Sequence, residues 1–124
     1  MTTRVLIVDD SRLARMAVIK GLTRLRPDFA YLEASNPDEA MAVLRTEPVG
    51  IAIIDFNMPV RDGLALTAEL RELHPAMPIA LVSANTQEEI LDRAAQLGAT
   101  FLTKPLNEAA LGAFLDAAVK SSST

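Results

Sequence analysis

Charged and hydroxyl residues in this chain stand directly after short apolar runs, in positions where they could do chemistry together. The runs RVLIV, IAII, IALV and TFLT are followed by Asp9 and Asp10, by Asp55, by Ser83 and by Lys104, respectively. If each run is a buried parallel strand, these residues lie at the carboxyl ends of strands, where open α/β sheets place their ligand crevice. Three carboxylates, a hydroxyl and an ammonium group would then meet in one shallow pocket.

The acidic residues of this set predict a metal site. Carboxylates that converge within a few ångströms repel one another, so such a cluster needs a cation or raised pKa values. Magnesium suits the site because it is held by one or two carboxylates, keeps several waters and binds phosphate oxygens. We therefore expect Asp9, Asp10 and Asp55 to bind Mg²⁺. The alternative is that Asp9 and Asp10 only cap a helix and that Asp55 is a turn residue at a strand end.

Asp55 is the candidate nucleophile of the site. A carboxylate can accept a phosphoryl group to form an acyl phosphate, and a nearby cation such as Lys104 stabilises the charge on the transferred group. Pro105 lowers the cost of a cis peptide bond after Lys104. The Ser83 hydroxyl can hydrogen-bond a phosphoryl oxygen, although a turn serine is the simpler interpretation. The sequence contains no glycine-rich nucleotide-binding motif, Walker loop or Cys/His cluster.

Length and composition limit the possible functions. With 124 residues, half of them hydrophobic, the chain fits one domain, residues 1–124, with one core. A net charge of −4 and a pI near 4.9 argue against a nucleic-acid surface. The sequence has no cysteine, which excludes disulfides and suits a reducing compartment. No apolar run approaches membrane-spanning length, so we expect a soluble cytoplasmic protein.

Five apolar runs alternate with five amphipathic helical patterns. The runs begin near residues 4, 30, 51, 79 and 100, and the first helix is expected over residues 11–25. The next three helices are expected to begin at Asn36, at Asp62 and at a capping box over residues 86–89, and to end before Pro48, before Pro75 and at Gly98. Asn107 is expected to cap the fifth helix, and residues 121–124 to form a frayed polar tail. This alternation predicts a doubly wound parallel sheet with helices on both faces.

The polar residues at the ends of the expected strands make the sequence resemble the receiver domain of two-component response regulators. The resemblance covers essentially the whole chain. The resemblance implies a flavodoxin-like (βα)₅ fold with strand order 2-1-3-4-5. It also implies that Asp9 and Asp10 bind the metal, that Asp55 is phosphorylated, and that Ser83 and Lys104 respond to the phosphoryl group. In this family the Lys-Pro peptide bond is characteristically cis.

The resemblance assigns further roles. The backbone carbonyl of Asn57 would be another metal ligand, and Phe101 stands where receivers carry a switch aromatic, although a plain core role suits it as well. On the first helix, Leu13 and Met16 would form a docking flank with Leu106, unless they cover the fifth helix instead. The sequence departs from the family pattern in two places, which bear on partner identity more than on chemistry: Val60-Arg61 replace small or acidic residues, and Leu106 replaces an aromatic.

These observations predict a phosphorylation-controlled binding module of a two-component system. Its phosphoryl donor would be a sensor histidine kinase or a histidine phosphotransfer protein, and its output a contact with an unknown protein, as a monomer or weak dimer. It would catalyse only its own phosphorylation and dephosphorylation. One alternative is a haloacid-dehalogenase-type Mg²⁺ phosphatase, although that family has a second Asp where this chain has Asn57. The other is a pseudo-receiver that binds without phosphorylation.

Overall fold

The computed structural model describes residues 2–58 and 62–122, with side chains as far as Lys120. Its centre is a five-stranded parallel sheet with the order β2-β1-β3-β4-β5. The strands are β1 (Arg4–Val8), β2 (Ala30–Ala34), β3 (Ile51–Asp55), β4 (Ile79–Ser83) and β5 (Thr100–Thr103). The predicted fold class and strand order are both confirmed.

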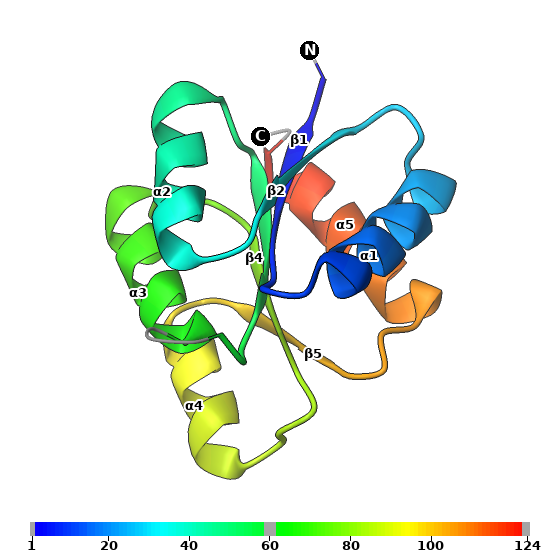
Figure 1. Cartoon of the computed structure of the whole chain (residues 1–124). Coiled ribbons are helices and arrows are strands. Elements are labelled where there is room, and N and C mark those ends of the chain that lie inside the picture. Colours follow the sequence, from blue (N-terminus) through cyan, green and yellow to red (C-terminus); the bar gives the residue numbers. More distant parts are fainter. Residues whose placement is uncertain (1, 59–61, 123–124) are drawn as a thin grey trace.

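Five helices connect the strands and cover both faces of the sheet. They are α1 (Arg12–Leu25), α2 (Pro37–Thr46), α3 (Gly63–Leu73), α4 (Glu88–Gln96) and α5 (Glu108–Ser122). Helices α1 and α5 lie on one face, and α2, α3 and α4 lie on the other (Figure 1). Right-handed crossovers on either side of β1 place α1 on one face and α2, α3 and α4 on the other.

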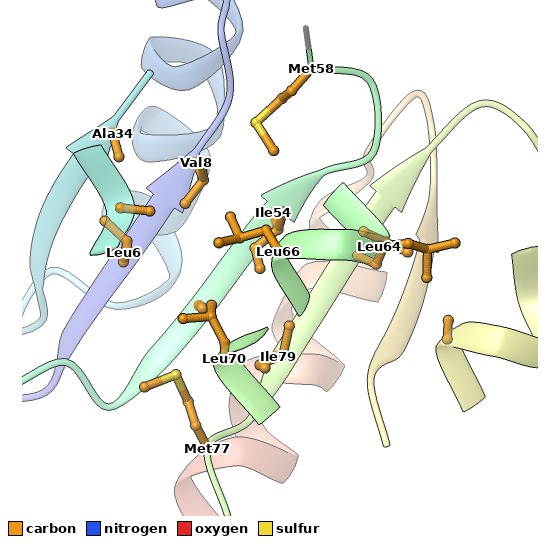
Figure 2. Close-up of a cluster of buried hydrophobic side chains, with 14 of the residues drawn as sticks. Leu6, Val8, Ala34, Ile54, Met58, Leu64, Leu66, Leu70, Met77 and Ile79 are labelled. Atoms are coloured by element: carbon orange, nitrogen blue, oxygen red, sulfur yellow. The ribbon is translucent and has the colours of Figure 1, made fainter. Parts of the chain in front are cut away.

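Alternate strand residues divide between two apolar clusters, one on each face of the sheet. On the α1/α5 face, Val5 and Ile7 of β1 and Ile53 of β3 pack with residues of α1 and α5. The intervening residues, such as Leu6 of β1 and Ile54 of β3, pack with α2, α3 and α4 on the α2–α4 face. Figure 2 shows part of this second cluster, including Leu6, Val8, Ile54, Leu64, Leu66, Leu70 and Ile79. Side chains alternate between the two faces of a strand, and helices cover both faces of this sheet. Strands made only of apolar residues are therefore buried on both faces.

Helices α2, α3 and α5 begin at the predicted capping residues, whereas Ser11, predicted as the first residue of its helix, is the N-cap of α1. Ser11 Oγ accepts a hydrogen bond from the Ala14 N–H at 3.2 Å, and Asn36 Oδ1 accepts one from Glu39 at 2.8 Å. Asp62 and Asn107 make the equivalent bonds to residues 65 and 110. Gly98, with a φ of 68°, ends α4 in a conformation that favours glycine.

The capping box predicted over residues 86–89 is wrong. Helix α4 begins one residue later, with Gln87 as its N-cap and no side-chain capping bond. The preceding loop explains the difference, because Ser83 Oγ accepts the Asn85 N–H at 2.9 Å and Asn85 Oδ1 accepts the Gln87 N–H at 3.0 Å. The side chains of Ser83 and Asn85 thus form two consecutive turns, and the helix starts only after the second turn.

Helix α5 reaches into the polar tail at residues 121–124, whose fraying stays a prediction. The helix continues to Ser122, two residues into the tail that was expected to be frayed. Neither glycine nor proline follows Gly112 in the sequence, and serine is a tolerable helix residue, so nothing in this segment ends the helix. Residues 123 and 124 lie outside the described part of the chain.

Arg71 joins three segments by hydrogen bonds at the amino-terminal ends of the strands. The guanidinium of Arg71 donates to the carbonyls of Leu97 and Met77, at 2.7 Å each, and to that of Pro75 at 3.0 Å. Longer bonds of 3.3 Å reach the carbonyls of His74 and Gly98. Arg71 therefore joins the end of α3, the loop before β4 and the end of α4.

Helix α3 begins directly against the end of β3, which makes Gly63 a sensitive position. A Cβ at Gly63 would collide with the carbonyl oxygen of Asp55 and lie 2.8 Å from Cα of Phe56. We expect Gly63→Ala to lower the free energy of unfolding by about 1–3 kcal/mol, because backbone atoms must move. The control is Gly112→Ala, whose Cβ would lie 3.8 Å from Leu25 and which should be neutral or stabilising by up to about 1 kcal/mol. Urea denaturation measures both, and equal effects would contradict the steric argument.

Candidate functional site

Strand alternation brings three of the predicted site residues to the α1/α5 face. Asp9, Asp55 and Lys104 each lie two residues after a strand residue that packs on that face. Their strands end at the same edge of the sheet, and all three side chains line one pocket between α1 and α5. The site thus lies beside the junction of β1 and β3, where the connections leave toward opposite faces.

The three acidic residues form the predicted cluster. One carboxylate oxygen from each of Asp9, Asp10 and Asp55 lies within 4.8 Å of the others. Asp9 and Asp55 are buried, with 7% and 5% of their surface exposed, whereas Asp10 is exposed. Two negative charges are therefore held away from water, with a third at the surface beside them.

Lys104 provides the positive charge closest to the phosphoacceptor candidate. Its Nζ lies 2.5 Å from Asp55 Oδ1, and 37% of its side chain is exposed. Although this distance defines an ion pair, Asp55 Oδ1 is buried and accepts no hydrogen bond with favourable direction. A buried carboxylate oxygen without a hydrogen bond, among other carboxylates, suits a hard divalent cation. The Lys104–Pro105 bond is cis, as predicted.

The environment of Asp9 opposes its ionisation. Burial raises the pKa of Asp9 above its usual value of 3.8, and the neighbouring charge of Asp55 acts in the same direction. The hydrogen bond from the Ser11 N–H to Asp9 Oδ1, 2.9 Å long, and the charge of Lys104 act against this rise. Asp9 therefore makes the bond expected of a residue that precedes a helix and also belongs to the acidic cluster.

Ser83 and Phe101 lie on the other side of the sheet from the acidic cluster. Ser83 follows Leu81 by two residues in β4, and both Leu81 and Phe101 pack on the α2–α4 face. Leu81 and Phe101 are register partners on parallel strands, so Ser83 stands two residues beyond the partner of Phe101 on the same face. The Ser83 hydroxyl is fully buried and accepts the Asn85 N–H, which leaves its own proton available for donation.

Asn57 and the predicted docking residues have different surroundings. Asn57 is exposed and lines a hollow with Asp10, which places it beside the acidic cluster. Leu13 and Met16 are 79% and 53% exposed, so they do not cover α5. Leu106 is instead partly buried against the α1/α5 cluster. The departure from the family pattern at Val60 and Arg61 lies outside the described residues.

Arg15 is a supporting residue that the sequence analysis missed. Its Nη1 donates to the backbone carbonyl of Asp9 at 2.6 Å, and its Nε pairs with Glu33 Oε1 at 2.9 Å. Only 13% of the Arg15 side chain is exposed. The arginine holds the backbone at the end of β1, where the acidic pair begins. In the sequence, Arg15 stands three residues after Arg12 on an amphipathic helix, and nothing in this spacing indicates the contact with Asp9.

Comparison with known proteins assigns the chain to a family. The family model for the response regulator receiver domain matches residues 5–116. The chain belongs to this family and is a phosphorylation-accepting signalling module. Its cluster of Asp9, Asp10 and Asp55 fits the magnesium site of receiver domains.

Individual relatives show the same similarity within longer proteins. A protein-glutamate methylesterase/protein-glutamine glutaminase of Thiobacillus denitrificans is 38% identical over 109 residues, which cover 85% of this chain and 30% of the relative. The transcriptional regulatory protein GlrR of Escherichia coli is 31% identical over 118 residues, covering 94% of this chain and 26% of the relative. The chain thus spans less than a third of the length of these curated relatives.

The fold is also similar to that of solved structures. The chemotaxis protein CheY4 of Vibrio cholerae superposes with a TM-score of 0.85 at 28% identity, covering 95% of this chain and 99% of that one. A response regulator receiver protein of Pseudomonas putida gives a TM-score of 0.86 at 28% identity, covering 94% and 98%. Among the described residues, no helix is long and apolar enough to span a membrane.

Relief of charge repulsion should stabilise the metal-free protein. We expect Asp9→Asn to raise the free energy of unfolding by on the order of 1 kcal/mol, because the amide still accepts the Ser11 N–H but carries no buried charge. Asp10→Asn should have a smaller effect, because Asp10 is exposed. Both variants should gain less stability than the wild type from added Mg²⁺ in thermal melts. An unchanged gain for either variant would remove that residue from the ligand set.

The stabilisation by Asp9→Asn should depend on pH. Because the pKa of Asp9 is raised in the folded protein, its ionisation lowers the free energy of unfolding as the pH rises from 3.8 through the raised value. The variant lacks this loss, so its advantage over the wild type should grow across that range and then level off. Denaturation curves at several pH values without magnesium test this, and a constant difference would contradict it.

Proposed function

We propose that Asp55 accepts the phosphoryl group and that Asp9, Asp10, Asp55 and the backbone carbonyl of Asn57 hold Mg²⁺. The observation that carries this proposal is the approach of three carboxylate oxygens within 4.8 Å of one another, with the Lys104 ammonium 2.5 Å from Asp55. This set combines a nucleophile, ligands for a hard cation and a fixed positive charge.

The chain's own residues would carry the transfer in the following way. A carboxylate oxygen of Asp55 attacks phosphorus, the bond between phosphorus and the donor atom breaks, and the donor leaves with that electron pair. Lys104 offsets the charge that spreads over the phosphoryl oxygens, while Arg15 keeps the Asp9 carbonyl in place. Bound Mg²⁺ would supply further charge neutralisation for the acidic cluster and the phosphoryl group.

Two other functions compete with this proposal. A haloacid-dehalogenase-type phosphatase would need a carboxylate two residues after the nucleophile to act as acid and base, and this chain has Asn57 there. A pseudo-receiver would lack part of the phosphorylation chemistry, whereas the acceptor, the acidic pair and the lysine are all present. The family match over residues 5–116 favours neither alternative.

The phosphoryl donor in this proposal is a sensor histidine kinase or a histidine phosphotransfer protein, acting in the cytoplasm. It would dock on Leu13, Met16 and Leu106, because the two helix residues form an exposed apolar flank of α1 and Leu106 lines the pocket into which Asp55 faces. The output would be a contact with another protein, made by a monomer or weak dimer. The protein would turn over no substrate beyond its own aspartyl phosphate.

Signal transmission in this proposal crosses the sheet. The phosphoryl group on Asp55 would attract the Ser83 hydroxyl, which now accepts the Asn85 N–H, and so draw the loop before α4 inward. Phe101 would then rotate further into the α2–α4 cluster, against which it is already partly buried. Because phenylalanine has no hydroxyl, the inward position gains only apolar burial, so its coupling to phosphorylation is weak.

The acceptor assignment has a direct test. We expect incubation with acetyl phosphate and magnesium to add one phosphate to the wild type and none to Asp55→Asn, since the amide is not a nucleophile for this transfer. Omission of magnesium should abolish the adduct. Intact-mass spectrometry measures all three, and an equal adduct on Asp55→Asn would show that another residue is the acceptor.

The docking surface can be separated from the chemistry. We expect Leu13→Glu to slow phosphotransfer from the partner at least tenfold, because a charge replaces an apolar contact, while the rate with acetyl phosphate stays unchanged. The matched control is Leu73→Glu, which alters another exposed leucine, at the far end of α3. Transfer from phosphorylated partner kinases, followed with radiolabelled phosphate, measures the effect. If both variants slow the transfer equally, Leu13 is not part of a specific docking surface.

A further inference from the structure

Met16 is the one methionine with an exposed side chain among residues 2–58 and 62–122, which the structure describes. It is 53% exposed, whereas Met58 and Met77 are 9% and 7% exposed. Met41 is partly buried against the α2–α4 cluster. Because the sequence has no cysteine, the Met16 thioether is also the most accessible sulfur in this part of the chain. A thioether in water is open to oxidation, and burial protects the others.

The surroundings of Met16 on α1 are apolar and positively charged. Leu13, three residues earlier, is 79% exposed and forms the apolar flank together with Met16. Arg12 and Lys20 stand four residues before and after Met16, so they lie on the same face of the helix, and both are exposed. Helix α1 contains no acidic residue. An oxygen atom added to the Met16 sulfur would therefore have hydrogen-bond donors on its own helix face.

We propose that Met16 is a site of reversible oxidation by peroxides and that its sulfoxide weakens docking of the phosphoryl donor protein. The proposal rests on the docking part of the proposed function and adds its regulation. In the oxidation, the sulfur lone pair attacks one oxygen of hydrogen peroxide and the O–O bond breaks. The proton of the transferred oxygen goes to the leaving hydroxide, which departs as water. Sulfur loses two electrons and the peroxide gains them.

Oxidation of Met16 changes the docking surface and leaves the fold intact. Among the described residues, Met16 belongs to neither apolar cluster, so the new oxygen enters no apolar interior. In a complex, however, the oxygen would be pressed against an apolar partner surface and would lose its hydrogen bonds to water, which is unfavourable. Met16 also does not line the pocket that contains Asp55 and Lys104, so phosphorylation by a small donor should not change.

The first measurement is the rate of oxidation at each methionine of the folded protein. After treatment with hydrogen peroxide, peptide mapping by mass spectrometry should show that Met16 gains oxygen at least tenfold faster than Met58 and Met77, because these two are buried. The mapping also separates Met16 from Met1, which lies outside the described residues. Equal rates at Met16 and Met77 would overturn the proposal.

The second measurement is phosphotransfer, after removal of the peroxide, from the histidine kinase that phosphorylates the untreated wild type fastest. The oxidised wild type should accept phosphate about tenfold more slowly than the untreated protein, and methionine sulfoxide reductase should restore the rate. Met16→Leu keeps an apolar side chain that peroxide does not oxidise, so its rate should survive the treatment. Met16→Gln, with a polar side chain, should slow the transfer without peroxide.

The matched control is Met41→Leu, which removes a methionine of α2, away from the docking surface. A change between leucine and methionine is well tolerated in a packed position, and this variant should remain as sensitive to peroxide as the wild type. Loss of sensitivity in Met41→Leu together with its retention in Met16→Leu would assign the effect to Met41 and overturn the proposal.

Acetyl phosphate separates this proposal from the proposed function. With magnesium, oxidised and untreated wild type should gain phosphate at the same rate, and equal slowing of the acetyl phosphate and kinase reactions would overturn the proposal. Unchanged kinase transfer after complete oxidation of Met16 would also overturn it, while the acceptor chemistry stands. Absence of an adduct from acetyl phosphate on the untreated protein would overturn the proposed function. Absence of transfer from every histidine kinase would overturn the proposed donor and this proposal with it.

Discussion

The mutual repulsion of Asp9, Asp10 and Asp55 is the constraint on which the rest of the site depends. Three carboxylate oxygens within 4.8 Å are unfavourable unless positive charge is close, and Lys104 supplies only part of it. The fold therefore has to hold this cluster together against its own charge. It does so with buried parallel strands on either side and with a backbone carbonyl bonded to Arg15. A bound divalent cation would convert this unfavourable arrangement into a favourable one.

The alternation of side chains along the strands gives the two faces of the sheet different tasks. Asp9, Asp55 and Lys104 belong to the α1/α5 face, together with the pocket. Ser83 and Phe101 belong to the α2–α4 face by the same rule. A phosphoryl group on Asp55, as proposed, would lie between these faces, so that an event on one side could reach helices on the other. A register shift of one residue in any of these strands would turn its side chains to the opposite face and so mix the two sets of residues.

Much of this arrangement was predictable because its causes are local. Apolar runs that end in Asp, Ser or Lys identified the strands and the end of the sheet where these polar residues meet. Asn36, Asp62 and Asn107 marked three helix starts by their side-chain acceptors. The position of the α4 start was not predictable, because Ser83 and Asn85 accept backbone N–H groups in two turns that precede a helix starting one residue later than predicted. These turns depend on loop geometry, which the residue types alone do not determine.

Contacts between distant parts of the chain escaped prediction for another reason. The bond from Arg15 to the Asp9 carbonyl spans six residues, but it depends on Glu33 of β2, which holds the guanidinium from the other side. The space between α1 and α5 likewise depends on which small residues happen to face Leu106 and Leu111. Neither feature has a sequence pattern of its own, because each results from the packing of finished elements.

The two ends of α4 are held very differently. Its carboxyl end receives hydrogen bonds from Arg71, which also binds the loop before β4, and closes at Gly98. Its amino end has no side-chain cap and is attached to the sheet through the two turns after Ser83. A pull on Ser83 would thus tilt α4 about its fixed carboxyl end, near the amino-terminal ends of the strands, rather than translate the whole helix. The displacement would be largest at Glu88 and Glu89, so the first turn of α4 is where a partner would read the largest change in surface charge.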